Sequence, residues 1–170
     1  MRIYLIGYMG SGKSTLGKEL AFRLSLPFVD MDQAIEKKYG NTVQEIFKGE
    51  GEAAFRTKEQ ACLHEIAAGQ DAVVATGGGA PCFFDNMDLM NATGCCIFLD
   101  VAPEELARRL MNARDIRPLV QEASSKEELV EKITKMMKDR RPYYEKARFI
   151  VSGNRITAEE VIDKVGGSCE

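Results

Sequence analysis

Short apolar runs alternate with amphipathic stretches along the whole chain. The apolar runs are bounded by turn residues and predict strands at residues 2–6, 27–29, 72–75, 95–99 and 149–151. Between them, apolar residues recur at helical spacing, as Leu16, Leu20 and Leu24 do. This spacing predicts helices at residues 13–24, 31–39, 51–68, 125–143 and 157–165, with a break near Pro142, and shorter helices that begin at Thr42 and Pro103.

This alternation is typical of a mostly parallel sheet with helices on both faces. Ligands of such sheets bind beyond the carboxyl ends of the strands. Gly7, Asp30, Gly77 and Asp100 each follow a predicted strand. We therefore expect these positions, although distant in sequence, to line one edge of one crevice.

Length, charge and cysteine content limit the expected number of domains, the partners and the compartment of the protein. A chain of 170 residues indicates one domain, and a net charge of −3 gives no global attraction to nucleic acid or anionic membranes. The five cysteines form no CxxC pair, which favours a reducing cytoplasm and no disulfide framework. No apolar stretch approaches the roughly 20 residues that span a bilayer. We expect a cytoplasmic protein, working as a monomer, with no membrane or nucleic-acid partner.

The most specific motif is a phosphate-binding loop. The sequence GYMGSGKS at residues 7–14 matches GxxxxGK[ST] and lies between a predicted strand and a predicted helix. Its backbone N–H groups and the helix N-terminus would hold phosphate oxygens. Lys13 would reach the β- and γ-phosphates of ATP, and the Ser14 hydroxyl would bind Mg²⁺. The loop positions expected to bind nucleotide are Gly10, Ser11, Gly12, Lys13, Ser14 and Thr15.

Two carboxylates, Asp30 and Asp32, come directly after the second predicted strand. Alternate positions would point both side chains the same way if strand geometry persists. One carboxylate can then organise the waters of Mg²⁺, while the other accepts a proton from an attacking hydroxyl. The structural alternative is a helix N-cap followed by a first-turn acid.

Glycines and arginines mark the rest of the candidate site. The triplet at residues 77–79 follows a strand, exposes backbone amides and permits close approach of a ligand. Arg56 and Arg140 lie on predicted helices, where each alone is compatible with a solvated position. Arg117 lies in the charged segment 112–124, for which we expect a mobile lid.

Six segments together resemble the shikimate kinases. They are the phosphate loop, DMD at 30–32, GEAAFR at 51–56, TGGG at 76–79, RPL at 117–119 and RRPYY at 140–144. Their order and spacing match the family from Ile3 to about Val165. The resemblance implies a three-layer α/β/α P-loop fold of the nucleoside monophosphate kinase type. It also implies one kinase domain over residues 1–170, with a substrate-binding segment at about 31–62.

The resemblance further implies an activity, the transfer of phosphate from ATP to the 3-hydroxyl of shikimate, and a role for each site residue. Asp32 would hold ring hydroxyls and act as the base, and Asp30 would support the Mg²⁺ water shell. Arg56 and Arg140 would clamp the carboxylate of shikimate beside the backbone of Gly77, Gly78 and Gly79. Arg117 would close over the transferred phosphate, and Arg109 and Arg155 would flank adenine.

Other functions remain open from the residues alone. A related small-molecule kinase, such as one for gluconate, would share Lys13 and Ser14. A nucleotide-binding switch would bind ATP or GTP without an acceptor, although Asp32, Arg56 and Arg140 weigh against it. The acid at Asp100 resembles a Walker B aspartate, yet a role at the strand end is favoured.

Overall fold

The computed structural model describes residues 1–114 and 117–166 of the chain. In this part of the chain, parallel strands form one sheet in the order β2-β3-β1-β4-β5. The strands are β1 (Ile3–Ile6), β2 (Phe28–Asp30), β3 (Val73–Ala75), β4 (Cys95–Asp100) and β5 (Phe149–Ser152). Each lies where an apolar run predicted it.

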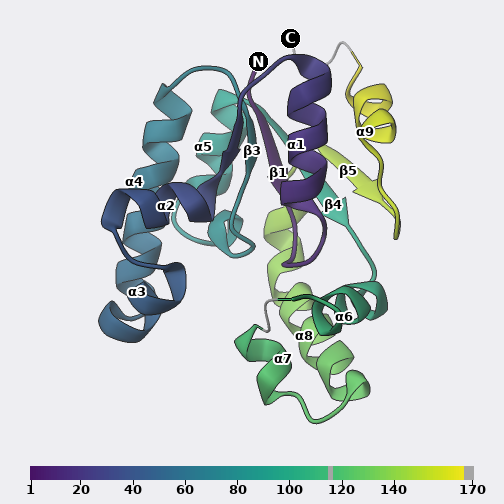
Figure 1. Cartoon of the computed structure of the whole chain (residues 1–170). Coiled ribbons are helices and arrows are strands. Elements are labelled where there is room, and N and C mark those ends of the chain that lie inside the picture. Colours follow the sequence, from purple (N-terminus) through teal and green to yellow (C-terminus); the bar gives the residue numbers. More distant parts are fainter. Residues whose placement is uncertain (115–116, 167–170) are drawn as a thin grey trace.

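Helices cover both faces of this sheet (Figure 1). α1 and α9 pack on one face, while α2, α4, α5 and α8 contribute to the core on the other. The helices are α1 (Lys13–Leu24), α2 (Met31–Tyr39), α3 (Val43–Glu50), α4 (Glu52–Ala68), α5 (Asn86–Thr93), α6 (Pro103–Met111), α7 (Pro118–Glu122), α8 (Lys126–Tyr144) and α9 (Ala158–Val165), with a 3₁₀ turn η1 (Ala80–Cys82). The predicted three-layer α/β/α arrangement is confirmed.

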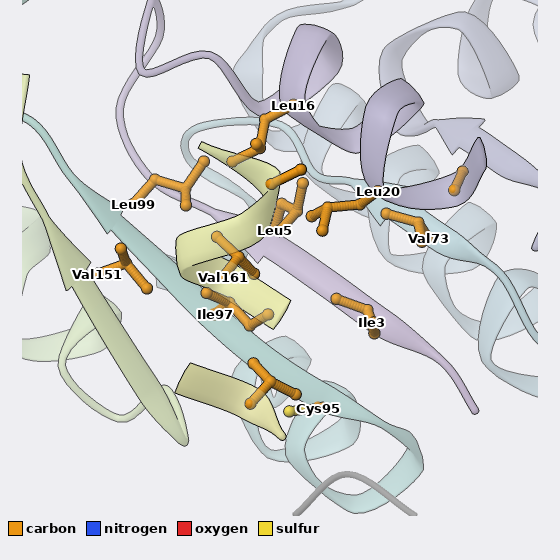
Figure 2. Packing of buried hydrophobic residues seen from close by; sticks show 13 residues of the cluster. Ile3, Leu5, Leu16, Leu20, Val73, Cys95, Ile97, Leu99, Val151 and Val161 are labelled. Carbon is orange, nitrogen blue, oxygen red and sulfur yellow. The ribbon is translucent and has the colours of Figure 1, made fainter. Parts of the chain in front are cut away.

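Alternation along β1 divides the core between the two faces. Ile3 and Leu5 point into one cluster, together with Leu16 and Leu20 of α1 and Val161 of α9 (Figure 2). The intervening residues of β1 point into the opposite cluster. Because successive strand residues alternate in direction, a fully buried strand is apolar at every position.

The register of the strands brings their carboxyl ends to one edge. Asp30 of β2 pairs with Ala75 of β3, and Leu5 of β1 pairs with that same alanine. The ends of β1, β2 and β3 therefore meet at one level, as predicted for Gly7, Asp30 and Gly77. At this edge the phosphate loop, the start of α2 and the glycine triplet come together.

The helices depart from the expectations in two respects. The helix α8 continues through Pro142 to Tyr144 without the predicted break, although the proline cannot donate a helical hydrogen bond to the carbonyl of Lys138. The helices α5 and α7 and the turn η1 were not predicted, because each is too short to show a helical repeat of apolar residues. Cys62, Cys82 and Cys96 of the described residues are free thiols.

Two further features concern the apolar character of the helices and the exposure of the histidine. Among the described helices, none combines the length and the apolar character of a membrane span. His64, the one histidine of the sequence, lies exposed on α4.

Candidate active site

The phosphate loop joins β1 to α1 with glycines in conformations that other residues rarely adopt. Gly10 and Gly12 have φ values of 81° and 94°, in the left-handed region that favours glycine. Gly12 is the N-cap of α1, and no side chain of the described residues caps this helix start. The first N–H groups of α1 therefore face the loop, where an anion would satisfy them.

Lys13 is buried beneath this loop. Its Nζ donates to the carbonyl oxygens of Gly7 at 2.7 Å and Tyr8 at 2.9 Å. Burial lowers the pKa of Lys13 to about 8, against the opposing charge of Asp32. The ammonium group is thus held against the backbone of the loop. Phosphate oxygens bound there would be stronger partners than the backbone carbonyls.

Ser14 and Asp30 form the candidate magnesium site. The Ser14 hydroxyl donates to Oδ2 of Asp30 at 2.7 Å, while Oδ1 accepts from the backbone N–H groups of Asp32 and Gln33. Asp30 is therefore an N-cap as well as a neighbour of the phosphate loop. In the described residues, no group of three or more His, Cys, Asp or Glu side chains could hold a metal ion. One hydroxyl and one carboxylate fit Mg²⁺, which keeps several waters and phosphate ligands.

Asp32 lies in the first turn of α2, not on an extended strand. The expectation of strand alternation across residues 30–32 is wrong, because the helix begins at Met31. Burial, and next the charge of Asp30, raise the pKa of Asp32, against the opposing charges of Lys13 and Arg117. A raised carboxyl pKa suits a group that accepts a proton near neutral pH.

Arg56 is buried on α4 with a side-chain nitrogen that lacks a partner. Its Nη1 donates to Oε1 of Glu59 at 2.8 Å and its Nη2 reaches Oε1 of Glu52 at 3.4 Å. Only 8% of the residue is exposed, and its Nε has no hydrogen-bond partner in the described part of the chain. A buried N–H without a partner is rare in a folded protein and is consistent with a ligand at this arginine.

Each glycine of the triplet packs against a side chain that is predicted to bind the substrate. A side chain on Gly77 would place its Cβ 3.2 Å from Oδ1 of Asp32 and 2.8 Å from Glu59. The same atom on Gly78 would lie 3.3 Å from Nη1 of Arg140. On Gly79 it would lie 2.5 Å from Nη2 of Arg56. The triplet is therefore the point around which Asp32, Arg140 and Arg56 converge.

Glu59 and Tyr144 are site residues that sequence reasoning missed. Burial raises the pKa of Glu59, against the opposing charge of Arg56, and Asp32 and Arg140 also act on it. The hydroxyl of Tyr144 donates to the carbonyl of Gly78 at 2.5 Å. A signal for the glutamate exists in the sequence, because residues three apart share a helix face. No such signal links Tyr144 to the glycine triplet.

A separate cavity of about 410 Å³ adjoins the phosphate loop. Arg109 connects three elements there: its Nε donates to Glu105 at 3.0 Å, its Nη1 to the carbonyl of Gly10 at 3.1 Å and its Nη2 to the carbonyl of Asn154. Arg155 lines the same cavity. The cavity lies beside the phosphate loop, because several of its lining residues belong to that loop. The lining residues are Gly10, Ser11, Gly12, Thr15, Leu16, Glu19, Arg109, Arg155 and Ile156. Both predicted adenine neighbours therefore lie together.

The larger cleft, of about 1180 Å³, lies between α2, α3 and the segment expected to be a lid. Asp32, Phe47 and Lys48 line one side, and Arg117 and Leu119 line the other. Arg117 is exposed as the N-cap of α7, and its charge acts on both Lys13 and Asp32. Residues 115–116 of the expected lid lie outside the described residues.

Asp100, which was expected to line the same crevice as Gly7, Asp30 and Gly77, is instead paired with Arg141 of α8. It ends β4 and receives two hydrogen bonds from Arg141, at 3.1 and 2.9 Å. The acid therefore connects the sheet to α8, as the strand-end interpretation predicted. It is not part of the Ser14–Asp30 site.

A family model and close relatives match this chain. The model described as shikimate kinase matches residues 9–169. A curated shikimate kinase from Bacteroides fragilis is 45% identical over 163 residues, which cover 96% of this chain and 90% of the relative.

Solved structures agree in fold and in sequence. A crystal structure of shikimate kinase from Bacteroides thetaiotaomicron has a TM-score of 0.89 and 43% identity, and the match covers 97% of this chain and 94% of the other. Shikimate kinase from Acinetobacter baumannii in complex with shikimate has a TM-score of 0.83 and 34% identity, over 96% and 89% of the two chains. These likenesses confirm the predicted P-loop kinase fold.

Proposed function

The chain belongs to the shikimate kinase family, and we propose that its site transfers the γ-phosphate of ATP to the 3-hydroxyl of shikimate. The products are ADP and shikimate 3-phosphate. One observation carries the assignment of the acceptor site. Asp32, Arg140 and Arg56 converge on the glycine triplet, beside the phosphate loop.

The two arginines would bind the carboxylate of shikimate. A guanidinium group matches a planar carboxylate with two parallel N–H donors. Arg56 supports this role with its buried, unpaired Nε. Arg140 contributes a second cation beside Gly78, on the opposite element α8. Asp32 would then receive the ring hydroxyls at the inner end of the cleft.

Phosphoryl transfer depends on alignment and on neutralisation of charge. Lys13 would bind the β- and γ-phosphates, Arg117 would cover the transferred group, and Asp32 would accept the proton of the attacking hydroxyl. Ser14 and Asp30 would hold Mg²⁺, which neutralises charge on the phosphate oxygens when bound. Arg109 and Arg155 would flank adenine in the smaller cavity.

Further features of the enzyme remain predictions. We expect residues 1–170 to act as one kinase domain, with a substrate-binding segment at about 31–62 and a lid at about 112–124. We also expect a monomer that works in the cytoplasm, without a nucleic-acid or membrane partner.

A coupled assay of ADP release tests the substrate. Shikimate, gluconate and nucleoside monophosphates are compared at equal concentration with ATP and Mg²⁺, and the phosphorylated position is identified by ³¹P NMR. We expect turnover with shikimate and a product phosphorylated at the 3-hydroxyl. Faster turnover with gluconate would support the alternative small-molecule kinase. ATP binding without turnover of any acceptor would support a switch.

A further inference from the structure

We infer that Phe83, in the segment that follows the glycine triplet, is a positioning residue for the acceptor. Its ring holds the guanidinium group of Arg56 in the orientation that binds the carboxylate. The inference rests on the proposed role of Arg56 and adds a residue outside the six motifs that define the resemblance.

The contact between these two side chains is close. The guanidinium carbon of Arg56 lies 4.2 Å from the centroid of the Phe83 ring. The rings of Phe55 and Phe47 are more distant, at 5.2 and 5.8 Å. The same guanidinium packs against Gly79, where a Cβ would lie 2.9 Å from its central carbon. Arg56 is thus confined between the glycine triplet and the aromatic side chain that follows it.

The chemistry of this contact suits a carboxylate site. The face of a guanidinium group carries no N–H donors, so an aromatic ring can cover it without competing for hydrogen bonds. The donors lie at the edges, where Glu59 takes Nη1 and Nε has no partner in the described residues. A guanidinium held by its face loses less freedom when it binds a planar anion.

The backbone holds Phe83 in place through a strained turn. Phe84 has a φ of 52°, a left-handed conformation that is unusual for a phenylalanine, and its side chain is 60% exposed. The fully buried Asn86 donates to the carbonyl of Ala80 at 3.0 Å and closes this segment. Strain of this kind persists where the surrounding structure fixes it, and it is concentrated at functional sites. Two adjacent phenylalanines therefore have opposite environments, one against Arg56 and one in solvent.

Phe83→Leu tests the inference, with Phe84→Leu as the matched control. We expect Phe83→Leu to raise the KM for shikimate roughly 3- to 30-fold, the range of a cation–π contact, with kcat and the KM for ATP unchanged. Phe83→Tyr keeps an aromatic face and should restore most of the affinity. Phe84→Leu should leave every constant unchanged. Thermal unfolding checks that each variant is folded, and Phe83→Met replaces the leucine variant if that variant is not.

The same substitution in an Arg56→Ala background separates the outcomes, with shikimate binding measured by titration calorimetry. If Phe83 acts through Arg56, Phe83→Leu has no further effect once the arginine is absent. An equal effect in both backgrounds, or no effect in either, would overturn the inference about Phe83 and leave the proposed function intact. If Arg56→Ala itself leaves shikimate binding unchanged, the carboxylate role of Arg56 fails, and this inference fails with it.

Discussion

At the scale of single residues, the site removes charged groups from water and shifts their proton affinities. Burial lowers the pKa of Lys13 to about 8 and raises the pKa of Asp32 and Glu59. Both directions follow from the cost of a charge in a poorly solvated place. The shifts of Lys13 and Asp32 suit their proposed roles, because one binds phosphate oxygens and the other accepts a proton.

Substitution of Asp32 by asparagine keeps the size of the side chain but removes the proton acceptor. We expect kcat to fall by roughly 10²–10⁴-fold, the usual contribution of a positioned base. Steady-state kinetics at saturating shikimate and ATP measure this change. A variant with an unchanged kcat would show that Asp32 is not the base and is not needed to align the acceptor.

The lowered pKa of Lys13 predicts how nucleotide binding depends on pH. The unliganded enzyme loses the Lys13 proton as the pH rises through about 8, whereas bound phosphates favour the charged form. ATP affinity should therefore be constant below pH 8 and should fall above it, by up to about tenfold per pH unit.

Titration calorimetry between pH 7 and pH 10 measures this dependence, with shikimate binding as the control ligand. Shikimate affinity should change less, because its proposed carboxylate partners are arginines, which stay charged in this range. An ATP affinity that stays constant to pH 10 would contradict the proposed contact between Lys13 and the phosphates.

At the scale of elements, α8 connects the sheet to the glycine triplet. Arg141 pairs with Asp100 at the end of β4, and Tyr144 donates to the carbonyl of Gly78. Arg140 lies on the same helix, next to that glycine. The position of the helix and the position of Arg140, the proposed carboxylate partner, are therefore fixed together.

Tyr144→Phe tests this connection, because it leaves the carbonyl of Gly78 without its donor. Loss of a partner at a buried polar group costs about 1–3 kcal/mol in the free energy of unfolding. We expect a loss of this size by chemical denaturation, together with a higher KM for shikimate. Tyr143→Phe, on the exposed neighbour, should change neither quantity. Equal effects of the two substitutions would rule out a specific tether.

The lid makes a second prediction at this scale. Hydrogen exchange in residues 112–124 should slow when ATP and shikimate bind together, because Arg117 would then contact the transferred phosphate. Mass spectrometry of peptides from this segment measures the change, with peptides of α9 as an internal control. Exchange that is unchanged by both ligands would argue against closure.

Sequence patterns predicted the helices, strands and motifs far better than the contacts between side chains of different elements. The strand ends and the phosphate loop were predictable, because apolar runs and glycine spacing are local features. Glu59 was detectable only from its distance of three residues to Arg56, and nothing local marked Phe83. The motif at residues 140–144 includes Tyr144, but it does not show that the hydroxyl bonds to Gly78. These contacts depend on how the segment after β3 and the helix α8 pack, and that packing cannot be predicted from sequence spacing.

At the scale of the whole molecule, two cavities lie near one edge of the parallel sheet. Arg109 and Arg155 line the cavity beside the phosphate loop, while Asp32 and Arg117 line the larger cleft. Lys13 directly follows Gly12, which lines the smaller cavity, and the charges of Asp32 and Arg117 of the larger cleft both act on it. In the proposed function, the fold would thus present a nucleotide and an acceptor to each other across residues that are distant in sequence.

The central claim is that this site recognises its acceptor through a carboxylate held by Arg56. The most direct test compares kcat/KM for shikimate and its methyl ester, in the wild type and in Arg56→Ala. Truncation of one member of a buried charge pair costs roughly 2–5 kcal/mol, so the variant should lose most of its activity towards the acid and much less towards the ester. The two changes should therefore be strongly non-additive. If their effects simply add, Arg56 does not bind the carboxylate, and the account of acceptor recognition is wrong.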